Sequence, residues 1–115
     1  VVGRFLEHAR IFWFADAGDD ELLLGSADLM PRNLDGRVEV VFPVLDPELR
    51  REVRDDILRT HLQDTAKARR LRSDGTWTRV QPSGDDPPVD SQARIVERRR
   101  ATVPDPVIVP TADSV

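Results

Sequence analysis

The sequence predicts an α/β fold, in which one main amphipathic helix packs on a small mixed sheet. Two features point to this class. Short aromatic and β-branched runs lie between turn residues, as strands do, and one apolar pattern repeats at helical spacing. The chain has 115 residues, of which 39% are hydrophobic. This size and composition suit one domain with a modest core.

Three strands are predicted in the N-terminal half. The first two flank a turn of small and acidic residues at 15–20, which indicates a hairpin. The third follows a loop marked by Pro31 and Gly36, and its alternation should place Arg37 and Glu39 on one face. The predicted strands span residues 11–14, 21–24 and 37–42.

The main helix is predicted over residues 47–63. Asp46 can accept hydrogen bonds from the first turn, Pro47 stands where its missing N–H costs nothing, and Glu48 suits the positive end of the helix dipole. The apolar residues at helical spacing are Leu49, Val53, Ile57, Leu58 and Leu62. One face should therefore pack, while the arginine-rich remainder faces water.

A second hairpin and a polar C-terminal region should follow this helix. Residues 66–71 and 76–81 flank Ser73-Asp74-Gly75, which is a strong hairpin signal. Residues 82–88 are dense in proline and acidic residues, so we expect a linker there and the end of the packed core near residue 81. Beyond it we expect a short arginine-rich helix at 91–101 and a disordered tail at 102–115.

Composition excludes several classes of function. Seventeen Lys and Arg residues against twenty-one Asp and Glu give a net charge of −4, which argues against a generally basic nucleic-acid-binding surface. The absence of cysteine excludes disulfides, thiol nucleophiles and thiolate metal sites, and two histidines are too few for a histidine-only zinc site. We expect no metal site in this chain, no membrane span and a cytoplasmic location, with membrane association left open.

Polar residues collect beside the predicted strand ends. His8 precedes the first strand, Ser26 follows the second in a Gly-Ser turn, and Arg32 and Arg37 lie in and after the next loop. Imidazole, hydroxyl and guanidinium groups together can hold phosphoryl oxygens. In the structural alternative, His8 caps a strand and the loop side chains satisfy one another. Composition alone leaves both interpretations open.

Two short motifs resemble those of the phospholipase D superfamily. His8-Ala9-Arg10 is similar to its His-x-Lys signature, and Gly25-Ser26-Ala27-Asp28 is similar to the Gly-Ser-x-Asn element that follows. Arg10 replaces the lysine, and Ala15 stands where that family has an aspartate. These departures argue against a free-standing lipase or nuclease.

Longer motifs resemble the C-terminal end of bacterial polyphosphate kinase over roughly residues 3–72. In order, they are Gly-Arg-Phe-Leu-Glu-His, Gly-Ser-Ala-Asp-Leu-Met-Pro-Arg-Asn-Leu-Asp, Arg-Val-Glu-Val and Thr-Ala-Lys-Ala-Arg. The resemblance implies a phospholipase D-like fold. It makes residues 1–81 part of the polyphosphate kinase C-terminal domain, truncated at its N-terminal side, and leaves residues 82–115 as linker, short helix and tail.

The resemblance also implies an enzyme that reversibly transfers the terminal phosphate of ATP to inorganic polyphosphate, with Mg²⁺, through a phosphohistidine outside this chain. His8 matches the second active-site histidine, which contacts the nucleotide phosphates and acts as an acid toward the leaving group, a task that suits imidazole near neutral pH. Arg37 matches a phosphate-contacting position, and we expect Ser26 and Arg32 to bind phosphate with it.

The family's nucleophile and magnesium-binding residues lie upstream, so we expect this chain to be inactive alone. It would act with the remaining domains of the enzyme, in a homo-oligomer of the full protein. ATP or ADP and polyphosphate are the expected partners of the kinase, and nucleic acid is not.

A second hypothesis is a non-catalytic module that binds a polyanion, either polyphosphate or nucleic acid. Residues 66–80 carry a net charge of +4, and Lys67 and Arg69 are the candidates for lining a polyphosphate channel. A solvated basic face is the simpler interpretation of the same charges. His61, on the predicted helix, is expected to be a packed or surface histidine and not a ligand.

Overall fold

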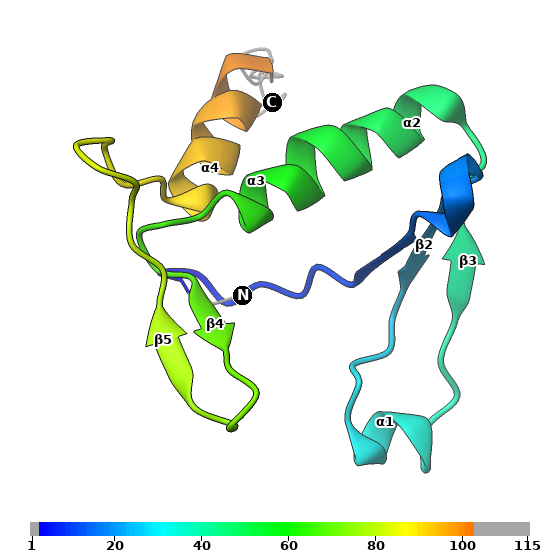
Figure 1. Cartoon of the computed structure of the whole chain (residues 1–115). Coiled ribbons are helices and arrows are strands. Elements are labelled where there is room, and N and C mark those ends of the chain that lie inside the picture. The colour runs from blue at the N-terminus through cyan, green and yellow to red at the C-terminus, as the bar shows by residue number, and fades with distance from the viewer. Residues whose placement is uncertain (1–2, 103–115) are drawn as a thin grey trace, which may run out of the picture.

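The strands of the computed structural model, which describes residues 3–102, form two separate small sheets (Figure 1). The first has the order β1-β2-β3 and the second is the hairpin β4-β5. The strands are β1 (Ile11–Phe14), β2 (Glu21–Gly25), β3 (Val41–Pro43), β4 (Arg69–Leu71) and β5 (Trp77–Arg79). The predicted α/β class is confirmed. Both sheets are antiparallel, and not mixed as predicted, and each strand pairs with a strand that neighbours it along the chain.

The predicted hairpin of the first two strands is confirmed. Ile11 pairs with Leu24 and Phe14 with Glu21, and the short helical turn η1 (Asp16–Gly18) joins the strands. Beside this turn, Trp13 Nε1 donates to Asp20 Oδ2 at 2.9 Å.

The third strand is shorter than predicted and lies further along the chain. We expected it over residues 37–42, but it spans Val41–Pro43, and Val38 is fully exposed. The cause lies in its partner, because β2 ends at Gly25 and leaves no strand edge beside residues 37–39. The one-turn helix α1 (Pro31–Leu34) occupies the connection between them.

One continuous helical segment follows β3, as predicted for residues 47–63. It consists of α2 (Pro47–Arg51), η2 (Glu52–Leu58) and α3 (Arg59–Leu62). Asp46 caps it as predicted, since its Oδ1 accepts from Glu48 N and Leu49 N at 2.9 Å each. Near the end of η2, Arg59 N donates to Arg54 O, five residues back, so the helix is wider there than an α-helix.

Asp20 connects this helical segment to the three-stranded sheet. Arg50 Nη2 lies 3.0 Å from Asp20 Oδ1, and Arg54 Nη1 lies 3.3 Å from Asp20 Oδ2. The hydrogen bond from Trp13 and these two cations outweigh desolvation and lower the pKa of Asp20. The polar turn after β1 therefore holds the helix against one end of the sheet.

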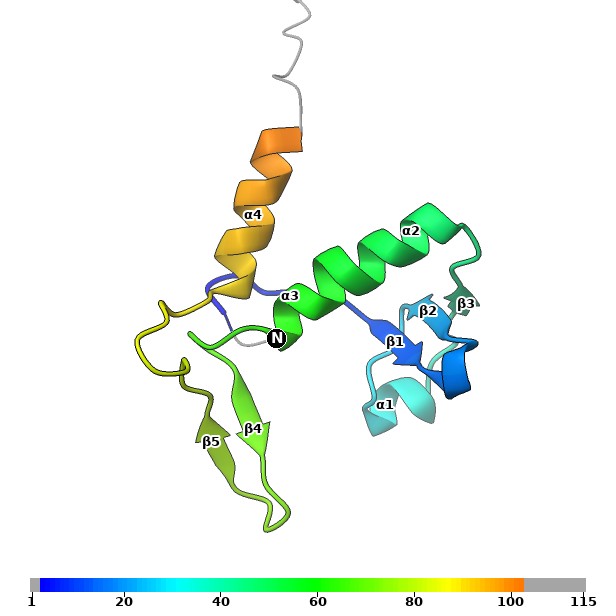
Figure 2. The same ribbon diagram turned by 45° about the horizontal axis from the view of Figure 1, so that its top comes forward.

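The second predicted hairpin is confirmed with shorter strands. Residues 66–68, 76 and 80–81 lie outside the strands that we expected to include them. Gly75 adopts a φ of +82° in the turn, a conformation that favours glycine, and Asp74 Oδ1 accepts from Thr76 N at 2.9 Å. The hairpin projects from the body of the molecule (Figure 2).

The packed part of the chain extends beyond residue 81, where we expected it to end. Helix α4 (Ser91–Thr102) confirms the short helix predicted there, and Ser91 and Gln92 at its start are buried. Thr102, which we placed in a disordered tail, ends this helix, and the rest of that predicted tail lies outside the described residues. The division of the chain into two parts at residue 81 stays a prediction.

Asp64 joins α3, the second hairpin and α4. It is 5% exposed, its Oδ1 accepts from Lys67 N at 2.7 Å and Ala68 N at 3.1 Å, and its Oδ2 accepts from Ser91 N at 2.8 Å. Burial alone would raise the pKa of Asp64. The hydrogen bonds that Ser91, Lys67 and Ala68 donate outweigh burial and lower this pKa to about 2.

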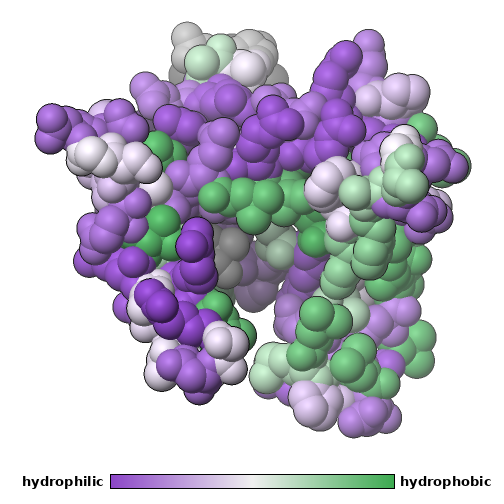
Figure 3. Space-filling model, viewed as in Figure 1, coloured by the Kyte–Doolittle hydropathy of each residue, from purple (hydrophilic) through white to green (hydrophobic). Residues whose placement is uncertain are grey.

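Among residues 3–102, only two hydrophobic residues, Leu22 and Ala27, are buried. Five buried residues are polar or charged: Asn33, Thr60, Asp64, Ser91 and Gln92. Apolar surface is visible over the region of the three-stranded sheet (Figure 3). Phe42 of β3 is 50% exposed, and Met30 before α1 is 45% exposed. Specific polar contacts therefore hold these elements together to an unusual degree.

Candidate functional site

His8 lies on the irregular segment that leads into β1, and it is exposed. Its carbonyl oxygen accepts from Arg10 Nη1 at 3.3 Å. Within residues 3–102 its imidazole ring forms no hydrogen bond or ion pair. The imidazole ring is thus available to bind a ligand, and its position depends on the backbone on either side of His8.

Arg10 and Asp28 form a two-point ion pair beside His8. Arg10 Nε lies 2.7 Å from Asp28 Oδ1, and Nη2 lies 3.0 Å from Oδ2. The hydrogen bond from Arg10 is the main cause of a lowered pKa of Asp28, and the charges of Arg32 and His8 contribute to it. This pair joins the two short motifs that resemble those of the phospholipase D superfamily, and it commits the Arg10 guanidinium to Asp28.

Ser26 connects the end of β2 to the segment before β3. Its Oγ donates to Glu39 Oε2 and accepts from Val40 N at 3.1 Å, while its own N–H donates to Val40 O at 2.9 Å. The hydroxyl that we predicted to bind phosphate therefore already has a donor and an acceptor within the protein.

The other predicted phosphate ligands are free in the part of the chain that the structure describes. Arg32 lies on α1, exposed, and acts on Asp28 through its charge. Arg37 is exposed and forms no ion pair with any residue of 3–102. The structure thus places His8, Arg10 and Arg32 around Asp28, and joins Ser26 to Glu39. Among residues 3–102, no hydrogen bond or ion pair joins the Arg37 side chain to this group.

The two candidate residues of a polyphosphate channel differ in their surroundings. Lys67 Nζ lies 2.7 Å from Asp90 Oδ2, so its charge is balanced within the protein. Arg69 on β4 is exposed and lies opposite Arg79 of β5. Arg79 Nη2 donates to Ala66 O at 2.5 Å. Within residues 3–102 the Arg69 side chain forms no ion pair, so Arg69, and not Lys67, is free to meet a polyanion.

Two side chains that are distant from Glu7 in the sequence contact its carboxylate, and no sequence motif indicated this cluster. Glu7 Oε1 lies 2.8 Å from His61 Nε2, and Glu7 Oε2 accepts from Gln92 Nε2 at 3.0 Å. The His61 contact lacks the alignment of a hydrogen bond, and both ring nitrogens are buried. His61 is therefore a packed histidine, one of the two alternatives expected.

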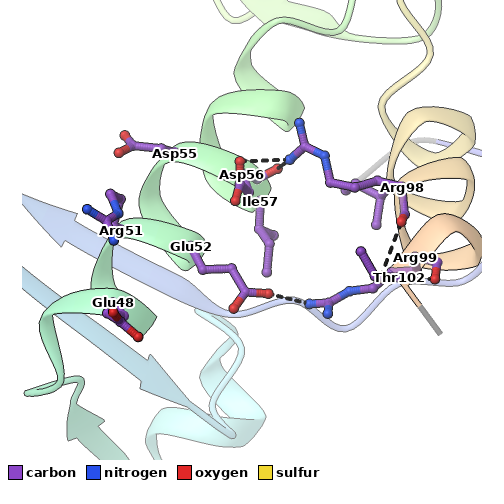
Figure 4. Close-up of a pocket in the computed structure, with 10 residues that line it drawn as sticks. Glu48, Arg51, Glu52, Asp55, Asp56, Ile57, Arg98, Arg99 and Thr102 are labelled. Atoms are coloured by element: carbon purple, nitrogen blue, oxygen red, sulfur yellow. Dashed lines mark hydrogen bonds and ion pairs between the residues drawn. The ribbon is translucent and has the colours of Figure 1, made fainter. Parts of the chain in front are cut away.

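The cavity between the long helical segment and α4 contains none of the predicted site residues. It has a volume of about 500 Å³, and two ion pairs cross it, Arg98 to Asp56 at 2.9 Å and Arg99 to Glu52 at 2.7 Å (Figure 4). Four of its seven charged lining residues therefore pair with one another, and the structural effect of these pairs is to hold α4 in place.

Neither a metal cluster nor a membrane-spanning helix is found in the described part of the chain. Between residues 3 and 102, no three His, Asp or Glu side chains are close enough together to hold a metal ion. No helix in the same range is long and apolar enough to cross a membrane.

Comparison with known proteins identifies relatives. Residues 1–92 match the family model described as polyphosphate kinase C-terminal domain 2. The chain is 52% identical over 99 residues to polyphosphate kinase 1 of Chlorobaculum tepidum, covering 86% of this chain and 14% of the relative. It is 45% identical over 103 residues to the Pseudomonas aeruginosa polyphosphate kinase, covering 90% of this chain and 15% of the relative.

A solved structure supports the same relationship. The crystal structure of polyphosphate kinase from Porphyromonas gingivalis matches with a TM-score of 0.75 and 42% sequence identity, and the match covers 88% of this chain and 15% of that one. This chain thus spans only about one-seventh of the length of these relatives. The family model matches most of its residues, and the chain therefore belongs to the polyphosphate kinase family.

Proposed function

We propose that this chain is the part of a polyphosphate kinase that supplies His8 to phosphoryl transfer between ATP and inorganic polyphosphate. The reaction is reversible and proceeds through a phosphohistidine outside this chain. One observation supports the proposal above all others. In this chain, which belongs to the polyphosphate kinase family, the His8 imidazole is exposed and unpaired within residues 3–102, and it lies beside the Arg10–Asp28 ion pair.

In this proposal His8 acts as an acid toward the leaving group. Imidazole changes its charge near neutral pH, so it can give a proton to a phosphate oxygen and regain it within a catalytic cycle. Asp28, whose pKa is lowered mainly by its hydrogen bond from Arg10, stays ionised and adds a negative charge near the ring.

Arg32 and Arg37 are proposed to bind the phosphate oxygens. Both are exposed, and neither is in an ion pair within the described residues, so their guanidinium groups can make two-point contacts with an anion. The Ser26 hydroxyl is a weaker candidate, because binding a phosphate would require it to give up Glu39 or Val40. Phosphoryl transfer depends mainly on positioning and electrostatic stabilisation, which such groups can supply.

The proposed reaction requires Mg²⁺, but the residues described here do not form a site for it. No three acidic or histidine side chains of residues 3–102 lie close enough to hold an ion, and Asp28 and Asp20 are committed to arginines. We therefore derive no step through the metal. In the proposal, the metal ligands, the nucleophilic histidine and the adenine pocket belong to the remaining domains of a cytoplasmic homo-oligomer.

A second candidate function is non-catalytic binding of a polyanion by the β4–β5 hairpin. The specific observation in its favour is that Arg69 and Arg70 are exposed and form no ion pair with any residue of 3–102, and that Arg69 faces Arg79 across the hairpin. In this alternative Arg69 binds phosphates through charge alone, with Lys67 contributing after release from Asp90. Such binding weakens steeply with salt.

Amide chemical-shift mapping of this chain separates the two candidates. The ligands are polyphosphate and, in a second titration, a non-hydrolysable ATP analogue. The proposed function predicts shifts at His8, at residues 25–28 and at Arg37 with both ligands. Shifts confined to residues 66–80, abolished by R69E/R70E and unaffected by His8→Ala, would reject the His8 site in favour of the polyanion-binding module.

A further inference from the structure

The backbone before His8 belongs to no helix or strand, yet one side chain from the other end of the chain holds it. Gln92 Oε1 accepts from Phe5 N at 3.0 Å, and Gln92 Nε2 donates to Phe5 O at 2.9 Å. Two residues in an antiparallel sheet exchange the same pair of bonds. The Gln92 amide thus substitutes for a neighbouring strand at Phe5.

The same amide also fixes the residue next to His8. Gln92 Nε2 donates to Glu7 Oε2 at 3.0 Å, and on the other side of that carboxylate His61 Nε2 lies 2.8 Å from Oε1. Gln92 therefore makes three of the four hydrogen bonds open to a primary amide. Side chains from α3 and α4 hold Glu7 between them.

The fit around Gln92 is tight. Gln92 is 6% exposed, and a Cβ added to Gly3 would lie 2.1 Å from Gln92 Oε1, so only glycine leaves room for the amide. The helix that carries Gln92 is itself fixed, because Ser91 N donates to Asp64 and Arg98 pairs with Asp56. The buried Gln92 amide on this anchored helix therefore fixes the position of the segment before His8, which has no neighbouring strand.

From these contacts we propose that Gln92 is a positioning residue for His8, acting through Phe5 and Glu7. The inference rests on the proposed function of His8. No described side chain holds the imidazole, so its place relative to a phosphate depends on the backbone, which Gln92 fixes on one side and the Arg10–Asp28 pair on the other. A displacement of about 1 Å in a reacting group can cost on the order of a hundredfold in rate.

The test uses a complete polyphosphate kinase that contains this chain as its C-terminal domain. Gln92→Leu removes all three hydrogen bonds while keeping the volume similar. We expect kcat for polyphosphate synthesis to fall by roughly 10- to 100-fold, with KM for ATP changed by less than about threefold. Gln81→Leu, which makes the same substitution at an exposed glutamine outside the site, should leave both constants at their original values.

A double-variant cycle with His8→Ala separates positioning from a general structural effect. If Gln92 acts through His8, then His8→Ala/Gln92→Leu should be no slower than His8→Ala alone. The positioning role would be overturned if the loss of kcat in the double variant were the product of the two single losses. It would also be overturned if Gln92→Leu had an unchanged kcat while His8→Ala was impaired. An unimpaired His8→Ala enzyme would instead refute the proposed function, so the two failures are distinguishable.

A milder variant keeps the proposal testable if Gln92→Leu does not fold. Gln92→Glu preserves an acceptor for Phe5 N but loses the donors to Phe5 O and Glu7 when ionised. We expect kcat to be reduced at pH 8 and to recover relative to the parent enzyme toward pH 6, where a protonated carboxyl regains a donor. Two results together would contradict the proposal. The ratio of the variant's kcat to the parent's kcat would stay the same across this pH range, and hydrogen exchange at residues 3–8 would be no faster in the variant than in the parent enzyme.

Discussion

Removing the charge of Asp64 should loosen the junction of α3, the β4–β5 hairpin and α4. Asp64 is 5% exposed, and its carboxylate accepts three backbone hydrogen bonds, which lower its pKa to about 2. Against an ordinary aspartate pKa of about 3.9, this difference corresponds to roughly 2–3 kcal/mol in favour of the ionised form in the folded protein. Asp64→Asn forfeits most of that free energy, because its NH₂ group must face a backbone donor.

Hydrogen exchange in the complete kinase measures this loss locally. A loss of 2–3 kcal/mol from the opening free energy corresponds to roughly 30- to 150-fold faster exchange at residues 64–68 and 89–92. Asp74→Asn is the matched control, since Asp74 also accepts from a backbone N–H but lies in the exposed hairpin turn. It should change exchange only in that turn.

The pH dependence has a definite sign. The pKa of Asp64 is lower in the folded state, so its stabilisation is complete above about pH 5 and declines as the pH falls toward 2. Protection factors at residues 64–68, which compare each exchange rate with that of an unstructured peptide at the same pH, should therefore fall over this range in the parent enzyme, while those of the Asp64→Asn variant should fall less. Equal exchange rates in parent and variant at pH 7 would refute the reasoning about this junction.

Two other substitutions test local features. Arg10→Lys keeps the charge but loses the two-point contact with Asp28. We therefore expect kcat of the complete kinase to fall at least tenfold, with little change in the KM for ATP. A kcat equal to that of the parent enzyme would show that the pair does not position His8. Asp46→Ala removes the acceptor for Glu48 N and Leu49 N and should cost about 1 kcal/mol of local stability, measured as several-fold faster exchange in α2; unchanged exchange would contradict the capping role.

Local signals in the sequence were sufficient for most of the elements. The cap at Asp46, the turn between β1 and β2 and the Asp-Gly turn of the second hairpin each depend on residues close together in the chain, and the structure confirms all three elements. The start of β3 could not be predicted in the same way. A strand needs a partner, and its extent depends on where β2 ends, at Gly25.

The candidate site was only partly predictable for a similar reason. The motifs around His8 and Ser26 pointed to a shared region, and the Arg10–Asp28 pair joins them. Neither the commitment of Lys67 to Asp90 nor the contact of Gln92 with Phe5 leaves a local signal, since the latter spans 87 positions along the chain. Only a folded chain shows which polar side chains are free and which are already bonded.

The central claim is that His8 supplies chemistry to phosphoryl transfer, and its most direct test is the kcat of His8→Ala in the complete kinase, measured in both directions of the reaction. An acid in the transition state typically contributes about 10²- to 10⁴-fold, so we predict a loss of that size in both directions, with the fold and the thermal transition retained. A His8→Ala enzyme with near-normal kcat in either direction would contradict the claim.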